Sequence, residues 1–180
     1  MMQGADWLRV VSVPVRAVNR VFTLCAGTLA LFILCVVLYD VTMRYVFDRP
    51  TIWAIDFASF ALSYLFFLSL APALDSGFHV SVDLFTHKLG PAFRRWASVL
   101  AALLAIVFAA ILFWELLDAT IEEFIENNLT PTAVPVRVKW IFLIGPIGSF
   151  QMLLTAVVVA IETMRGIVPS SPNGERLVES

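Results

Sequence analysis

The sequence is poor in charge and in histidine. Charged residues make up 14% of its 180 residues, whereas a soluble domain usually carries about a quarter. The net charge of −2 and the lack of a basic patch argue against nucleic acid as a partner. The only histidines, His79 and His87, lie outside the apolar runs. A haem bound between transmembrane helices by axial histidines is therefore not expected.

The sequence also has little cysteine and no recognisable catalytic set. Cys25 and Cys35 are the only cysteines, and they lie in one apolar run. On one helix they would stand about 15 Å apart along the axis, too far to form a disulfide. No Ser/His/Asp set, metal-ligand spacing or phosphate-binding loop occurs. We therefore expect no enzymatic activity, no catalytic or metal-binding residue and no cofactor.

Four long uncharged apolar runs make up most of the chain instead. Each is about as long as the 20 or so residues that a helix needs to cross a bilayer. A membrane-spanning segment must satisfy its own backbone hydrogen bonds, so each run should be a helix. The sequence predicts an all-α integral membrane protein with four transmembrane helices, embedded in membrane lipids. The runs cover residues 21–39, 57–74, 96–114 and 140–161.

The flanking residues predict the boundaries and orientation of these helices. Eight of the 12 lysines and arginines lie on the side of the termini and the second loop. The positive-inside rule therefore predicts that both termini are cytoplasmic. We expect a single domain, 1–167, followed by a flexible cytoplasmic tail, 168–180. The expected helices cover about 19–43, 52–75, 95–126 and 139–164.

The second loop carries a pattern of its own. His79, Asp83 and His87 recur every four residues, while Val80 and Leu84 recur on another face. This spacing predicts a short amphipathic helix along the membrane interface, between the second and third transmembrane helices. Within it, His79 and Asp83 could form a charge-assisted hydrogen bond.

The third loop begins with a stripe of acidic residues on the continuation of the third span. Leu117, Ile121 and Ile125 recur on a different face of the same segment. The helix should therefore continue about three turns beyond the membrane and end at Asn127-Asn128. The stripe is either a solvated surface or a docking site for a partner. Its residues are Glu115, Asp118, Glu122 and Glu126.

The centres of the apolar runs contain no charged residue. Transporters of ions or polar solutes generally need polar groups at mid-depth. A chain without them is expected to be a helper subunit, with no chemistry of its own. We interpret the polar groups at this depth as weak ones, such as Thr28, Ser63, Ser69 and Thr155.

The first helical hairpin carries a more specific pattern, which continues past the second apolar run. This pattern resembles the small membrane subunit of tripartite ATP-independent periplasmic (TRAP) transporters, the DctQ family, with a similar layout over residues 31–158. In that family a glutamate usually follows the tryptophan within three residues, and Asp56 fills this acidic position here. The segments that carry the resemblance are Arg44-Tyr45-Val46-Phe47, Pro50, Trp53-Ala54-Ile55-Asp56 and His79-Val80-Ser81-Val82-Asp83.

The resemblance implies a function and partners. Such subunits pair with a large multi-span membrane subunit, which holds the sodium and substrate sites, and with a periplasmic substrate-binding protein. The complex takes up organic acids in the bacterial inner membrane, driven by sodium, and the small subunit braces the large one. Two alternatives remain open: the small subunit of a tricarboxylate-type tripartite transporter, and the membrane anchor or assembly subunit of a redox enzyme.

The resemblance also singles out residues for contacts between subunits. Arg44 and Asp56 are expected to form a salt bridge, or to bridge to the large subunit, with Asp40 completing a polar cluster. Trp53 is an expected interface anchor, and His79 and Asp83 are further interface candidates. The acidic stripe would then dock the binding protein.

Overall fold

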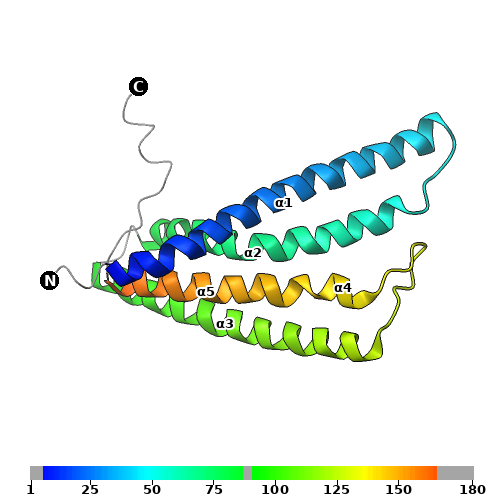
Figure 1. The fold of residues 1–180 in the computed structure, drawn as a ribbon. Coiled ribbons are helices and arrows are strands. Elements are labelled where there is room, and N and C mark those ends of the chain that lie inside the picture. Colours follow the sequence, from blue (N-terminus) through cyan, green and yellow to red (C-terminus); the bar gives the residue numbers. More distant parts are fainter. Residues whose placement is uncertain (1–5, 87–90, 166–180) are drawn as a thin grey trace, which may run out of the picture.

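The computed structural model describes residues 6–86 and 91–165, and it is helical over most of them (Figure 1). Four stretches are long and apolar enough to cross a membrane, and the fourth comprises α4 and α5. The described residues contain one isolated antiparallel bridge, between Leu129 and Arg137, and no β-strand. The predicted all-α architecture with four membrane-spanning stretches is confirmed. The helices are α1 (Asp6–Val46), α2 (Ala54–Thr86), α3 (Pro91–Glu126), α4 (Val138–Phe142) and α5 (Ile144–Arg165).

The helices form two hairpins that lie side by side. α1 packs mainly on α2, α3 packs mainly on α5, and α2 joins the hairpins by packing on α5 (Figure 1). α1 and α3 do not pack on each other within the described parts of the chain. We call the end with loops 47–53 and 127–137 the loop end, and the end where α1 begins and α5 finishes the terminal end.

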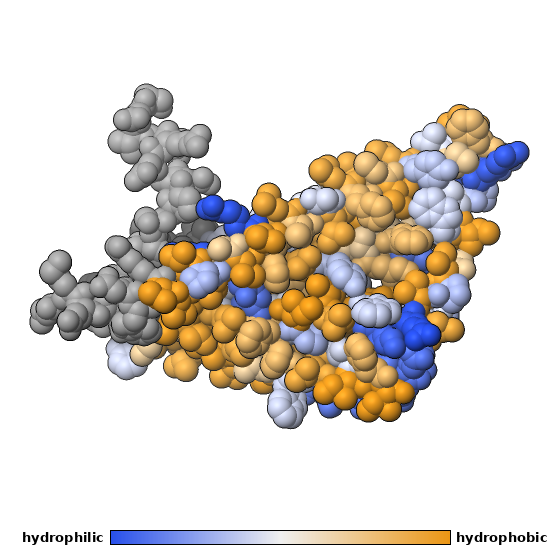
Figure 2. Space-filling view, viewed as in Figure 1, coloured by the Kyte–Doolittle hydropathy of each residue, from blue (hydrophilic) through white to orange (hydrophobic). Residues whose placement is uncertain are grey.

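The fourth span is the centre of this arrangement. Half of its most apolar window is buried inside the molecule, compared with 6% of the corresponding window of the first span. The first three spans therefore expose most of their apolar side chains, and the face seen in Figure 2 is largely hydrophobic. A soluble protein would bury such surface. In this fold it is available to lipid or to another membrane subunit.

α5 approaches α2 closely because Gly148 has no side chain. A Cβ added there would lie 2.4 Å from the carbonyl oxygen of Phe67. Ala71 and Ala109, both fully buried, continue this close packing on α2 and α3 together with Met152 of α5. Small residues that let helix backbones approach are a common means of packing in lipid.

The fourth span is interrupted at Leu143, between α4 and α5. Pro146 has no N–H to donate to the carbonyl of Phe142, four residues earlier. The hydroxyl of Thr120 on α3, which donates to the Leu116 carbonyl at 2.6 Å, also lies 3.3 Å from the Phe142 carbonyl. The hydroxyl of Tyr64 on α2 donates to the Trp140 carbonyl at 2.6 Å. The Phe142 and Trp140 carbonyls thus link α4 to α3 and α2.

Two helices are much longer than the sequence indicates. α1 starts at Asp6 rather than near residue 19, and α2 continues to Thr86 instead of ending near residue 75. The segment around His79 is thus helical, but it continues α2 and is not a separate interfacial helix. Helices propagate cooperatively until a stop signal, and the next strong one is Gly90-Pro91. The predicted tail, 168–180, lies outside the described residues.

At the loop end, α1 and α3 each finish one or two residues before a residue with positive φ. Asn127, at φ 54°, directly follows Glu126, and its N–H donates to the Glu123 carbonyl at 3.1 Å. Asp48, at φ 51°, lies two residues after the end of α1. Asparagine and aspartate tolerate the left-handed conformation better than most residues. Both chain reversals therefore have a local cause.

Candidate functional site

A polar cluster lies at the loop end of the first hairpin. The Asp40 carboxylate accepts a hydrogen bond from Arg44 Nη2 at 2.8 Å, one turn along α1. It also accepts hydrogen bonds from the Thr51 backbone N–H, at 3.2 Å, and from the Thr51 hydroxyl. Asp40 is buried, whereas the Arg44 side chain is about half exposed. The cluster ties loop 47–53 to α1 and leaves about half of the Arg44 side chain exposed.

The expected salt bridge between Arg44 and Asp56 does not form. Arg44 pairs with Asp40, and Asp56 Oδ2 accepts a hydrogen bond from the backbone N–H of Val134 at 2.9 Å. Sequence reasoning found both charged residues but paired them wrongly, because the partner of Asp56 is a backbone group 78 residues away. Asp56 therefore holds loop 127–137 against the start of α2.

Trp53 lies beside this cluster in an aromatic group. Its ring stacks on Tyr39 of α1, with centroids 5.8 Å apart, and meets Phe57 edge-on at the same distance. Part of the indole remains exposed. Such a position suits an amphipathic ring at the edge of the membrane, and the role of Trp53 as an anchor stays a prediction.

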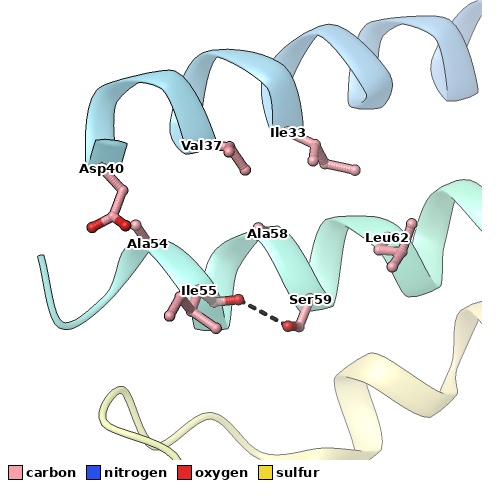
Figure 3. Close-up of a pocket in the computed structure, with 8 residues that line it drawn as sticks. All are labelled: Ile33, Val37, Asp40, Ala54, Ile55, Ala58, Ser59 and Leu62. Atoms are coloured by element: carbon pink, nitrogen blue, oxygen red, sulfur yellow. Dashed lines mark hydrogen bonds between the residues drawn. The ribbon is translucent and has the colours of Figure 1, made fainter. Parts of the chain in front are cut away.

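An open groove runs between α1 and α2 below the cluster (Figure 3). Its volume is about 280 Å³, and its lining is mostly apolar. Asp40 marks the loop end of the groove, while the Ser59 hydroxyl is engaged by the Ile55 carbonyl at 2.8 Å. Ala54 and Ala58 leave room on the α2 side. The groove offers space for an apolar chain and little for a polar ligand.

The four residues of the acidic stripe, Glu115, Asp118, Glu122 and Glu126, are all exposed on α3. Glu126 accepts a hydrogen bond from the Asn128 side chain at 2.7 Å. The stripe therefore lies on a free surface at the loop end. Its role in docking stays a prediction.

A second polar cluster, at the terminal end, was missed by the sequence analysis. Arg16 Nη2 of α1 donates to Glu162 Oε2 of α5 at 2.8 Å, and Arg16 Nε lies 3.9 Å from Asp75 Oδ1 of α2. Glu162 is buried, and Asp75 is partly buried. Three helices thus meet around one guanidinium. These residues flank the uncharged runs, so a search of the runs alone could not find them.

Next to this salt bridge lies a buried hydrogen-bond network of side chains. Gln151 Nε2 donates to Asn19 Oδ1 at 2.8 Å and to the Val15 carbonyl at 3.0 Å. Asn19 Nδ2 donates to Thr155 Oγ1 at 3.2 Å. Gln151 is an amide in the middle of the fourth run, and this was the signal that the search for charged residues overlooked. The network fixes α1 on α5.

His79 and Asp83 are located by their backbone in α2, but their side chains lie outside the described residues. The bond predicted between them stays a prediction. Within the described parts of the chain, no group of three histidine, cysteine, aspartate or glutamate side chains could hold a metal ion.

Comparison with known proteins identifies the family. Residues 33–166 match the family model of the DctQ component of tripartite ATP-independent periplasmic transporters. The sialic acid TRAP transporter permease protein SiaT of Haemophilus influenzae (strain 86-028NP) is 23% identical over 158 residues, which are 86% of this chain. The aligned region is only 25% of that relative, so this chain spans about a quarter of its length. The chain is a transport component and not an enzyme: it belongs to the DctQ family of TRAP transporter subunits.

Proposed function

We propose that this chain is the small permease subunit that braces the large membrane subunit of a TRAP transporter. The complex would take up an organic acid, driven by sodium and supplied by a periplasmic substrate-binding protein. It would lie in the bacterial inner membrane with both termini of this chain in the cytoplasm, as the distribution of lysine and arginine predicts.

The proposal rests on a contrast between the buried polar groups, which bind one another, and the exposed surface, which is largely apolar. The buried polar groups around Arg16 and Asn19 bind one another, so they are engaged in holding helices together. A substrate or ion pathway would need polar groups that face a cavity at mid-depth. The surface, by contrast, offers long exposed apolar faces on α1, α2 and α3. This combination suits a rigid support for a larger membrane protein.

The loop end supplies the proposed contacts with partners. The Arg44 side chain is about half exposed and pairs with Asp40, which lines the groove between α1 and α2; this position suits a contact with the large subunit. Asp56 would act indirectly, by holding loop 127–137. His79 and Asp83, near the other end of α2, remain candidates for the same interface. The acidic stripe, Glu115 to Glu126, would attract the soluble binding protein.

Reconstitution in vesicles tests the proposal. This chain, its large subunit and the binding protein should together take up a labelled carboxylate when an inward sodium gradient is applied. The panel of carboxylates should include sialic acid, which the relative named above suggests. Vesicles with this chain alone should show no uptake. Accumulation by the chain alone, or full uptake by the large subunit without it, would contradict the bracing role.

A further inference from the structure

The terminal half of α1 carries a row of apolar side chains on the face turned away from the other helices. Val10 and Val13 at its beginning are 73% and 64% exposed. Residues three or four positions apart share one face of a helix, so the row is continuous with the uncharged run 21–39. We call this row the valine stripe. Its members, all exposed, are Val10, Val13, Pro14, Ala17, Val21 and Leu24.

The valine stripe faces outward because the opposite side of α1 is fixed on α5. Asn19 lies nine residues after Val10, which is half a turn around the helix. Its buried side chain donates to Thr155 Oγ1 at 3.2 Å, and the Val15 carbonyl accepts from Gln151 Nε2 at 3.0 Å. These contacts set the rotation of α1, so the orientation of the stripe does not depend on a partner.

A row of arginines runs along one side of the stripe. Arg9, Arg16 and Arg20 are seven and four residues apart in α1, so the helix places them on one face. Arg16 is engaged by Glu162, whereas Arg20 is exposed and takes part in no ion pair with the described residues. The chain has no acidic residue between Asp6 and Asp40. Arg20 is thus a cation without a carboxylate on its own helix.

Arg20 also lies at the depth of a membrane surface. It is separated from Asp40, in the loop-end cluster, by a rise of about 30 Å, which is the thickness of a hydrocarbon core. The apolar stretch Val10–Val46 has 37 residues. This corresponds to about 55 Å of helix, more than a bilayer with its headgroups. A helix of this length tilts to keep its apolar surface in lipid, and α1 runs obliquely to α5 in Figure 1.

We infer that the valine stripe and Arg20 form a binding surface for anionic phospholipid at the terminal end. The valines lie among acyl chains near the headgroups, and the Arg20 guanidinium binds the lipid phosphate. Basic residues beside an apolar helix face are typical of segments that bind anionic membrane surfaces, because charge attraction adds to the insertion of apolar side chains. This lipid site does not depend on the transported solute or on the proposed bracing of the large subunit.

Native mass spectrometry of the full chain tests the headgroup contact. The chain is released from nanodiscs of phosphatidylcholine mixed with phosphatidylglycerol, and the retained phosphatidylglycerol is measured. Arg20→Gln should lower its retention about fivefold, the contribution of one arginine near an anionic surface. Arg20→Lys keeps the charge and should retain most of the lipid. Arg49→Gln is the matched control, because Arg49 is exposed in loop 47–53 next to Asp48.

Two outcomes of this measurement would contradict the inference. Retention by Arg20→Gln equal to that of the unaltered chain would show that Arg20 does not bind the headgroup. Displacement of phosphatidylglycerol by inorganic phosphate would assign the site to a soluble anion instead of a lipid.

A fluorescent probe on the valine stripe tests the acyl-chain contact. Val13→Cys, introduced after Cys25→Ala and Cys35→Ala, is labelled with an environment-sensitive dye in nanodiscs that contain nitroxide lipids. Nitroxides near the headgroups should quench it, whereas Leu24→Cys, further along the same stripe, should be quenched better by nitroxides deep in the acyl chains. Emission typical of water at Val13 would overturn the inference. Loss of quenching when the large subunit is added would mean that this subunit covers the stripe, with the same consequence.

Discussion

The two ends of the molecule are held together by different kinds of contact. At the terminal end, buried polar side chains of α1, α2 and α5 bind one another around Arg16 and Asn19. At the loop end, Asp40 and Asp56 hold the loops by accepting backbone hydrogen bonds. The exposed residues at the loop end of α3 and the groove between α1 and α2 remain open there. In the described part of the terminal end, polar side chains thus bind one another, while the loop end leaves exposed surface.

The close contact of α5 with α2 lies between the two ends, and breaking it should have the largest effect. Gly148→Ala places a Cβ against the Phe67 carbonyl, so the helices must separate. We expect a loss of stability of about 2–3 kcal/mol, as for overpacked cores. Denaturation of the purified chain in mild detergent measures it. Gly27→Ala is the control, because a Cβ there meets nothing within 4 Å. Equal effects of both substitutions would refute this account of the packing.

The second largest loss of stability is expected from breaking the buried hydrogen-bond network at the terminal end. Asn19→Leu or Gln151→Leu leaves the other amide without its partner, at a cost of about 1–2 kcal/mol each. The double variant should cost less than the sum of the two, because neither amide is then left behind. The same denaturation assay gives all three values. Strict additivity would show that the two amides do not act as a pair.

At the loop end, Asp56→Ala should loosen one loop and leave the global stability of the chain almost unchanged. The Val134 N–H loses its acceptor, so loop 127–137 should exchange its amide hydrogens faster. Mass spectrometry after deuterium labelling measures this, with loop 47–53 as the internal reference. If exchange increases equally in both loops, Asp56 has a global role instead. Loss of complex yield in this variant would connect the loop to assembly.

Asp40→Asn should have the smallest effect on the isolated chain. Asparagine can still accept a hydrogen bond from Thr51 but loses the ion pair with Arg44, which contributes little because the Arg44 side chain is about half exposed to solvent. The yield of the complex with the large subunit should fall further in Arg44→Ala, if the exposed guanidinium contacts that subunit. Normal yield in both variants would limit this cluster to a local role at the loop end.

The sequence was informative wherever a signal is local. Uncharged runs about as long as a bilayer is thick indicate membrane-spanning helices without reference to other parts of the chain. Spacing along one helix likewise places the glutamates of the acidic stripe on one side. The choice of partner for Asp56 is not local, because a carboxylate can accept from any donor that the fold brings near. The expected pair with Arg44 was wrong for that reason.

The amino-acid sequence by itself determined the class of the protein, because an apolar run in lipid can satisfy its backbone only as a helix. It also determined the family, through the order and spacing of residues around the first hairpin. Only the tertiary structure decided which helices are neighbours and which polar groups meet, since these depend on packing. Gly148 against Phe67, and Gln151 against Asn19, are contacts between residues far apart in the chain. They exist because α5 takes the central place between α2 and α3 and also packs against α1.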